Sequence, residues 1–304
     1  MMQQRGHRLH SAMIVYFDAI RRAGSIRAAA RQLNVASSAV NRQLLKLEEE
    51  LGVQLFDRLQ TGLKLTHAGS AFARHAIAVL QDAERLRSEL EAMRGLRSGH
   101  VEIAAIESLV PDLLPRVIAQ ARTLYPKITV GVSVLGSSAI PELLTAGDAD
   151  LGLAFDLARH RELDQIATFR LPLGAVMTPD HPLASREALS LSACMAYPLI
   201  LPKADLSIRP VLERTVSELP QGVIETNSVD LARRITLQSH GISFQTRIGI
   251  EEDLAAGRLC FVPIASPRPL SSDLGVYVRH TRNLPVAAHA LAGLFSEALQ
   301  RLAV

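Results

Sequence analysis

The stretch GSIRAAARQLNVASSAVNRQLLKLEEEL, residues 24–51, predicts two helices joined by a tight turn. Ser25 can cap the first helix, over 26–33, and Asn34 tolerates the left-handed conformation that ends it. Because the turn is short, one face of the second helix can pack while another enters the major groove of DNA. The packing face carries apolar residues at spacings of four, three and four: Val40, Leu44, Leu47 and Leu51.

The segments on either side complete this unit. Residues 9–23 predict a helix that adds Phe17 and Ile20 to the core. The segment VQLFDRLQTGLKLTHAG, residues 53–69, predicts a short β-hairpin with Thr61-Gly62 at its tip. Such a hairpin forms a wing beside the second helix, so residues 1–66 are predicted to be a winged helix-turn-helix DNA-binding domain.

The predicted DNA-contacting residues lie on the faces of the second helix that do not pack and on the wing. Arg58 and Lys64 flank the hairpin and are placed near phosphates. The second helix contributes five polar residues: Ser37, Ser38, Asn41, Arg42 and Lys46. Double-stranded DNA is therefore the predicted partner of this domain.

Two strings, LEEELGVQLFDR at 47–58 and LKLTHAG at 63–69, resemble the LysR-type transcriptional regulators, and the resemblance extends over the whole chain. It implies an effector-responsive transcription factor that forms dimers or tetramers and works with RNA polymerase. The chain departs from the family where the recognition helix begins. The family's capping Ser is Ala36 here and its base-facing Gln is Ser37, so we expect capping to shift to Ser37.

Length and charge agree with more than one folding unit. The chain has 304 residues, 48% of them apolar, which can supply at least two cores. Residues 1–99 hold fifteen Lys or Arg against nine Asp or Glu, whereas residues 100–304 hold eighteen against twenty-one. A basic first third suits DNA binding, although a solvated basic face gives the same imbalance. No apolar run of about twenty residues or secretion signal is found, so we expect a cytoplasmic protein without membrane contact.

A long linker helix with a heptad seam is predicted next, so that 67–98 holds the linker helix and a hinge. The alternative is an amphipathic helix packed on its own domain. We favour a dimerising coiled coil, and the family resemblance implies the same helix. The seam residues alternate at spacings of four and three: Phe72, Ala76, Val79, Ala83, Leu86, Leu90 and Met93.

From residue 99 onward, strands alternate with helices, which predicts parallel sheets covered by helices. The predicted fold class is α/β overall, with an all-α winged helix-turn-helix domain, a long linker helix and a C-terminal sensor. The resemblance implies a sensor of two lobes, like a periplasmic binding protein, over 99–304. Lobe I takes about 99–163 and 269–304, and lobe II takes about 164–268.

An effector site is predicted where strands end and helix N-termini point outward. Each polar residue there can also be read as a helix cap, but their convergence on one cleft favours binding. Lys203 and Arg209 lie close by, so a small carboxylate is the predicted effector, covered by apolar side chains. The predicted residues, some placed by the resemblance, are Ser108, Ser137, Ser138, Phe155, Leu201, Pro202, Asp205, Ser207, Asn227 and Phe244.

Catalytic and metal-binding patterns were also sought. The ten histidines form no H-E-x-x-H motif, and no G-x-S-x-G elbow or phosphate-binding glycine loop occurs. Cys194 and Cys260 lack the spacing of a metal or redox pair and are interpreted as ordinary thiols. We expect no enzyme activity, cofactor or metal. Two alternatives remain: a regulator whose C-terminal domain serves only for oligomerisation, and an α/β enzyme.

Overall fold

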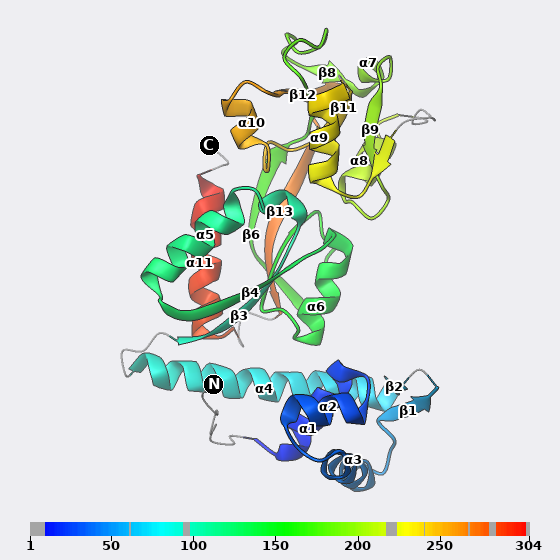
Figure 1. Cartoon of the computed structure of the whole chain (residues 1–304), viewed down its shortest axis with the longest axis vertical. Helices are drawn as coiled ribbons and strands as arrows, with labels where there is room; N and C mark the ends of the chain where they lie inside the picture. Colours follow the sequence, from blue (N-terminus) through cyan, green and yellow to red (C-terminus); the bar gives the residue numbers. More distant parts are fainter. Residues whose placement is uncertain are drawn as a thin grey trace. The chain divides into compact units, whose positions relative to one another are not determined.

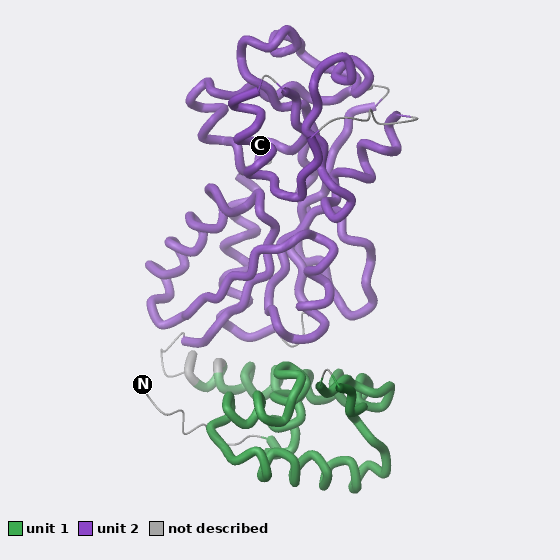
Figure 2. The backbone as a smooth tube through the Cα atoms, turned by 45° about the vertical axis from the view of Figure 1, so that its right-hand side comes forward, with its two compact units in different colours: residues 1–94 green, residues 95–304 purple. Residues whose placement is uncertain are grey.

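The computed structural model describes residues 10–60, 62–93, 98–216, 224–239, 241–266, 268–279 and 284–301. The chain divides into two compact units, residues 1–94 and 95–304 (Figure 2). Unit 1 contains four helices and one hairpin within these ranges (Figure 1). They are α1 (Ala12–Ala23), α2 (Ile26–Leu33), α3 (Ser37–Leu51), β1 (Phe56–Leu59), β2 (Gly62–Leu65) and α4 (His67–Met93).

The helix boundaries in unit 1 follow from local capping. Ser25 Oγ accepts a hydrogen bond from Ala28 N at 3.2 Å, and Asn34 ends α2 with φ at 53°, as predicted. The expected cap at Ser37 is wrong. Ser37 is the first residue of α3, and the preceding residue, Ala36, has no side chain able to accept a hydrogen bond, so this helix begins without a side-chain cap.

Three aromatic rings organise the unit 1 core. Phe17 lies 4.7 Å from Phe72 and 5.1 Å from Phe56, measured between ring centroids. Val40, Leu44 and Leu47 of α3 are buried in the same cluster. Leu51, predicted to share their face, is 44% exposed because it is the last residue of α3, where the chain turns at Gly52.

The seam along α4 is used in two ways. Phe72 and Ala76 pack into the unit 1 core, and Ala76 is fully buried. Leu86 and Leu90 are 42% and 48% exposed. The first turns of α4 therefore pack on unit 1 itself, as the alternative to a coiled coil predicted. Farther along the helix, Leu86 and Leu90 leave an exposed apolar stripe. The side chain of Met93 lies outside what the structure describes.

Unit 2 contains two sheets, which define its lobes (Figure 1). The lobe I sheet has the order β4-β3-β5-β13-β6 and is accompanied by α5 (Leu113–Leu124), α6 (Ile140–Ala146) and α11 (Val286–Gln300). Short 3-10 turns, η1 (Glu107–Leu109) and η2 (Ser137–Ala139), follow β3 and β4. The strand bounds are β3 Ser98–Ala105, β4 Lys127–Val134, β5 Leu151–Phe155, β6 Leu163–Pro172 and β13 Ser271–Arg279.

The lobe II sheet has the order β10-β9-β11-β7-β12-β8. Its strands are β7 (Gly174–Met177), β8 (Leu189–Ser190), β9 (Leu199–Pro202), β10 (Ile224–Thr226), β11 (Ile242–Gln245) and β12 (Cys260–Ser266). Its helices are α7 (Leu191–Cys194), α8 (Ile208–Glu213), α9 (Val229–Ser239) and α10 (Glu251–Ala255). Helix α8 ends at Glu213, and residues 217–223 lie outside the described ranges.

The sheets correct two expectations. They are mixed rather than parallel, because β13 runs antiparallel to β5 and β6, and β7 runs antiparallel to β11 and β12. Strand β6 was not predicted, and it pairs along β13 in the lobe I sheet although residues from 164 onward had been assigned to lobe II. The chain thus leaves lobe I after β6 and returns to it at β13.

Candidate functional site

The predicted DNA-contacting residues of α3 share one accessible side of unit 1. Four of them are exposed and Asn41 is half-buried, while the neighbouring Val40 and Leu44 face the core. Lys46 lies 3.8 Å from Glu50, one turn later, in an exposed ion pair that contributes little to stability. The four exposed residues are Ser37, Ser38, Arg42 and Lys46.

The wing is held near its tip by backbone contacts with Gly24. Leu63 N donates to Gly24 O at 2.8 Å, and a Cβ on Gly62 would lie only 2.7 Å from that oxygen. Gly62 also has φ at 128°, which favours glycine. Arg58 and Lys64 are both exposed on this hairpin, and Thr61 at the predicted tip lies outside the described residues.

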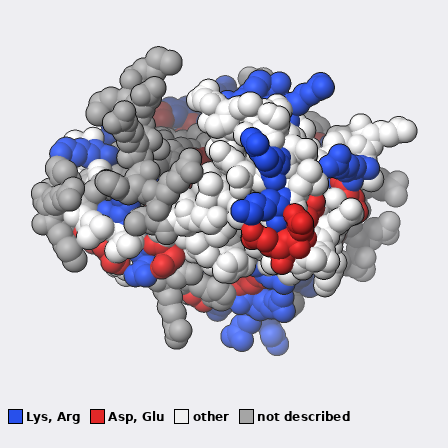
Figure 3. All heavy atoms as spheres, turned by 90° about the horizontal axis from the view of Figure 1, so that it is seen from below, with Lys and Arg blue, Asp and Glu red and all other residues white. Residues whose placement is uncertain are grey.

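Charge is unevenly distributed over the face seen in Figure 3, where Lys and Arg side chains form separate groups around an acidic cluster. Along α3 itself, Arg42 and Lys46 precede Glu48, Glu49 and Glu50. The basic side chains of this helix therefore lie in its second and third turns, beyond the first turn where the helix N-terminus adds positive potential.

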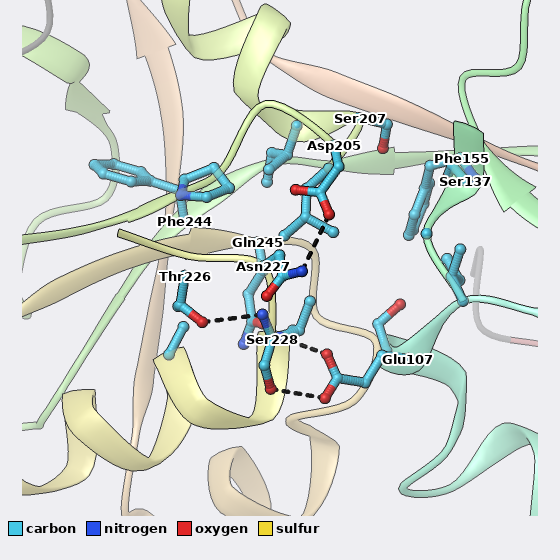
Figure 4. A pocket seen from close by; sticks show the side chains of 18 of the residues that line it. Glu107, Ser137, Phe155, Asp205, Ser207, Thr226, Asn227, Ser228, Phe244 and Gln245 are labelled. Atoms are coloured by element: carbon cyan, nitrogen blue, oxygen red, sulfur yellow. Dashed lines mark hydrogen bonds between the residues drawn. The ribbon is translucent and has the colours of Figure 1, made fainter. Parts of the chain in front are cut away.

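A cavity of about 370 Å³ lies between the two lobes of unit 2 (Figure 4). Ser138 and Leu201 do not line it. Leu201 is 1% exposed in the lobe II core, because side chains alternate along β9 and its neighbours Ile200 and Pro202 reach the cavity. The other eight predicted residues line it: Ser108, Ser137, Phe155, Pro202, Asp205, Ser207, Asn227 and Phe244.

The predicted serines are not side-chain caps of α-helices. Ser137 Oγ accepts from Phe155 N at 3.3 Å, and Ser207, although at the N-cap position of α8, makes no capping hydrogen bond. Ser228, beside the predicted Asn227, is the residue that caps: its Oγ accepts from Leu231 N at 3.1 Å in α9. The helix-cap alternative therefore applies to Ser228 and not to Ser207.

Sequence reasoning missed Glu107, which joins the lobes. Its Oε1 accepts from Ser228 Oγ at 2.8 Å and its Oε2 accepts from Val229 N at 2.6 Å. Val229 is the first residue of α9, so a lobe I carboxylate occupies the N-terminus of a lobe II helix (Figure 4). Negative charge is stabilised at that position. The available signal was an acidic residue beside the predicted Ser108, just beyond β3.

The lobes also meet beyond the cavity. Ile248, from the segment before α10, is buried in the lobe I core. Gly249 has φ at 87°, and a Cβ there would lie 2.6 Å from Ser108 O, so only glycine allows this approach. Glu251 Oε2 accepts from Gly249 N at 2.7 Å, and burial raises the pKa of Glu251.

The cavity lining includes two charged residues, both acidic, Glu107 and Asp205. Asn227 Nδ2 donates to Asp205 Oδ2 at 3.2 Å. Neither predicted cation lines the cavity: Lys203 is exposed elsewhere, and Arg209 donates to Glu213 and Glu225, each at 2.7 Å. The lining therefore lacks the cation on which the expectation of a carboxylate effector depended.

Gln245 supplies a further polar group to the cavity. Its side chain lines the cavity and the residue is 7% exposed. Among the described residues, the Gln245 Nε2 atom is buried without a hydrogen-bond partner. A buried amide nitrogen without a partner costs free energy, so this position favours a bound polar group.

The cysteines have the character of ordinary thiols. Cys194 is buried and Cys260 half-buried, and both are free. Burial raises the pKa of Cys194 to about 11, which disfavours the reactive thiolate. Among the described residues, no group of three or more His, Cys, Asp or Glu side chains is placed to hold a metal. None of the helices in the described ranges has the length and apolar character that a membrane span requires.

Comparison with known proteins identifies relatives over most of the chain. The RuBisCO operon transcriptional regulator of Allochromatium vinosum is 27% identical over 285 residues, covering 93% of this chain and 94% of the relative. The uncharacterized regulator YdcI of Escherichia coli is 28% identical over 254 residues, covering 82% of each chain.

Solved structures share the fold. A full-length OxyR variant from Pseudomonas aeruginosa has a TM-score of 0.77 at 18% identity, covering 97% of this chain and 96% of that one. Full-length CbnR in complex with its target DNA has a TM-score of 0.51 at 24% identity, covering 96% of this chain and 99% of CbnR.

Two family descriptions match the two parts of the chain. Residues 12–70 match "Bacterial regulatory helix-turn-helix protein, lysR family", and residues 94–300 match "LysR substrate binding domain". The second match spans more than half of the 304 residues. The chain therefore belongs to the LysR family and is a LysR-type transcriptional regulator with a substrate-binding domain.

Proposed function

We propose that this regulator binds operator DNA through α3 and the wing, pairs through the exposed part of α4, and is modulated by a small molecule in the inter-lobe cavity. The cavity is the observation that carries the proposal. Strand ends and helix N-termini from both lobes line it, so an occupant contacts both lobes and can change the equilibrium between their arrangements. A regulator without an effector, or an α/β enzyme, remains the competing function.

The DNA surface is supported by the exposure of Arg42 on α3 and of Lys64 on the wing, and by the similar fold of the DNA-bound CbnR. We predict that Arg42→Ala weakens binding to a selected duplex by about 1–3 kcal/mol if this residue reads a base. Lys64→Ala should weaken binding to all duplexes. It should also reduce, by about one, the magnitude of the slope of log K against log salt concentration. Fluorescence anisotropy at several salt concentrations, on a duplex selected from a random library, measures both. Unchanged affinity in both variants would remove this surface from DNA binding.

Pairing through α4 is supported by the exposure of Leu86 and Leu90 on a charged helix. Replacing both with Glu puts charge into the apolar seam and should convert dimers or tetramers to smaller species in sedimentation velocity. Leu124→Glu is the matched control, because Leu124 is equally exposed, at 53%, on α5 of the other unit. If the seam variant kept the wild-type assembly, another surface would have to mediate pairing.

Effector modulation is tested by filling the cavity. Ser207 lines the cavity, whereas Ser138 is exposed and does not line it. The affinity for DNA is measured with and without a small-molecule fraction of cell extract. We expect the wild type and Ser138→Trp to respond, and Ser207→Trp to keep its DNA affinity while losing the response. A response that survives in Ser207→Trp, or the absence of any response in the wild type, would favour a ligand-independent regulator.

A further inference from the structure

We propose that the inter-lobe cavity binds a small organic cation, an amine or guanidinium compound, with Glu107 and Asp205 as its counter-charges. This inference rests on the proposed effector function and names the chemical class of the ligand. It replaces the carboxylate predicted from the sequence, because the side chains that converge on the cavity have the opposite charge.

The charge of the lining is the first support. Glu107 comes from lobe I and Asp205 from lobe II, and no Lys, Arg or His is among the lining residues in the described part of the chain. Much of the remaining lining is apolar and includes Phe155, Ile200 and Phe244. Glu107 is half-buried beside these walls and Asp205 is exposed, so the described lining carries negative charge and offers no positive side chain to hold an anion.

The N-terminus of α9 is the second support. Free helix N-termini commonly bind anions, but here Ser228 Oγ and Val229 N already donate to Glu107 at 2.8 and 2.6 Å. A ligand carboxylate would have to displace Glu107 from both hydrogen bonds. A cation needs no such displacement.

Both carboxylates retain capacity for a ligand. A carboxylate offers about four acceptor positions, and the two donors on Glu107 use one on each oxygen. Asp205 accepts from Asn227 through Oδ2, and its Oδ1 has no donor among the described residues. Ammonium and guanidinium groups are the donors that match such acceptors.

Gln245 is the independent sign of a ligand. This residue is more than nine-tenths buried, lines the cavity, and has an amide nitrogen without a partner among the described residues. The ligand is therefore expected to carry a hydrogen-bonding group besides its cationic one, with a small body suited to a cavity of about 370 Å³. Because Nε2 of Gln245 is a donor, the group that meets it must accept a hydrogen bond, as a hydroxyl or carbonyl oxygen does.

The test uses isothermal titration calorimetry on the full-length protein without DNA. The probes are 4-amino-1-butanol and 4-guanidino-1-butanol, with 1,4-butanediol as the uncharged analogue and succinate as the anionic one. We expect the amines to bind at millimolar concentrations or below, and the diol and succinate to bind at least about tenfold more weakly. Succinate binding more tightly than the amines, or the absence of amine binding at millimolar concentrations, would overturn the assignment.

Variants locate the binding and separate it from folding. Asp205→Asn and Glu107→Gln should each weaken amine binding by about tenfold, because each removes a charged acceptor. Glu187→Gln, an exposed carboxylate outside the lining, should leave it unchanged. If Glu107→Gln destabilises the fold, Asp205→Asn is the variant that tests the proposal, because the Asp205 carboxylate is bonded only to the Asn227 segment among the described residues.

Equal affinity in Asp205→Asn and the wild type would exclude the carboxylate as a counter-charge. Amine binding without any change in DNA affinity would keep this inference and overturn the effector function.

Discussion

The N-termini of α3 and α9 differ in whether side chains accept hydrogen bonds from their backbone N–H groups. At α3 in unit 1, Ala36 offers no side-chain cap and the first residues are exposed. At α9 in unit 2, Ser228 Oγ accepts from Leu231 N, and Glu107 accepts from Val229 N. An open helix end is available to a phosphate, whereas a filled one is not available to an anion. The N-terminus of α9 is thus occupied by a residue 122 positions earlier in the chain.

The largest effect is expected when the Glu107 carboxylate is removed from the N-terminus of α9. Glu107→Ser removes the acceptor shared by Ser228 and Val229, and we predict a loss of about 2–3 kcal/mol in the free energy of unfolding of unit 2. Denaturant titration measures this loss. The open N-terminus should then bind small anions, so sulfate should raise the melting temperature of Glu107→Ser more than that of Glu187→Gln. Equal responses to sulfate would show that Glu107 does not control access to α9.

Adding a side-chain cap at the N-terminus of α3 should have a smaller effect, and it should raise the stability rather than lower it. Ala36→Ser supplies a side-chain acceptor at α3 and should stabilise unit 1 by about 1 kcal/mol. The matched loss is Ser25→Ala at α2, where the existing bond to Ala28 N is removed, and it should cost about the same amount. Thermal unfolding of the two variants checks the pair. A destabilised Ala36→Ser would mean that the backbone at this position does not permit capping.

The smallest effect is expected at Glu251, beside the other contact between the lobes. Burial raises the pKa of this carboxyl, so the folded state holds its proton more tightly than the unfolded state. Its contribution to stability is therefore complete in acid and is lost as pH rises towards the raised pKa. Glu251→Gln should remove that dependence between the ordinary carboxyl range and neutral pH, and it should be the more stable of the two proteins at neutral pH. Denaturation curves across this range would contradict the prediction if the wild type became more stable, relative to Glu251→Gln, as pH rose.

The sequence predicted local structure well and long-range contacts poorly. The helices of unit 1 follow from caps and periodicity within about fifty residues, and the prediction that Val40, Leu44 and Leu47 are buried is confirmed. Strand β6 was missed because it lies at a sheet edge and its first half is half-buried or exposed, so that buried and exposed residues alternate only at its end, around Phe169 and Leu171.

At the cavity, too, the local features were predicted and a long-range contact was not. Strand ends predicted Ser137 and Asp205 as lining residues because strand ends follow from hydrophobic pattern. The pattern did not predict that Glu107 reaches α9, because that contact depends on how the two lobes pack. The predicted roles of the lining residues and of the α3 and wing residues remain predictions.

One consequence of α4 concerns the order of assembly. An isolated helix shorter than about 12–15 residues is marginal in water, because its first turn is costly to nucleate. In this chain, Phe72 and Ala76 fix that nucleus when the winged domain folds. In the proposed dimer, pairing through Leu86 and Leu90 extends a helix whose first turns are already packed. The packing of Phe72 and Ala76 in the unit 1 core fixes which face of α4 carries the seam. In the proposed dimer, the helix that joins the two subunits therefore also sets the orientation of each recognition helix.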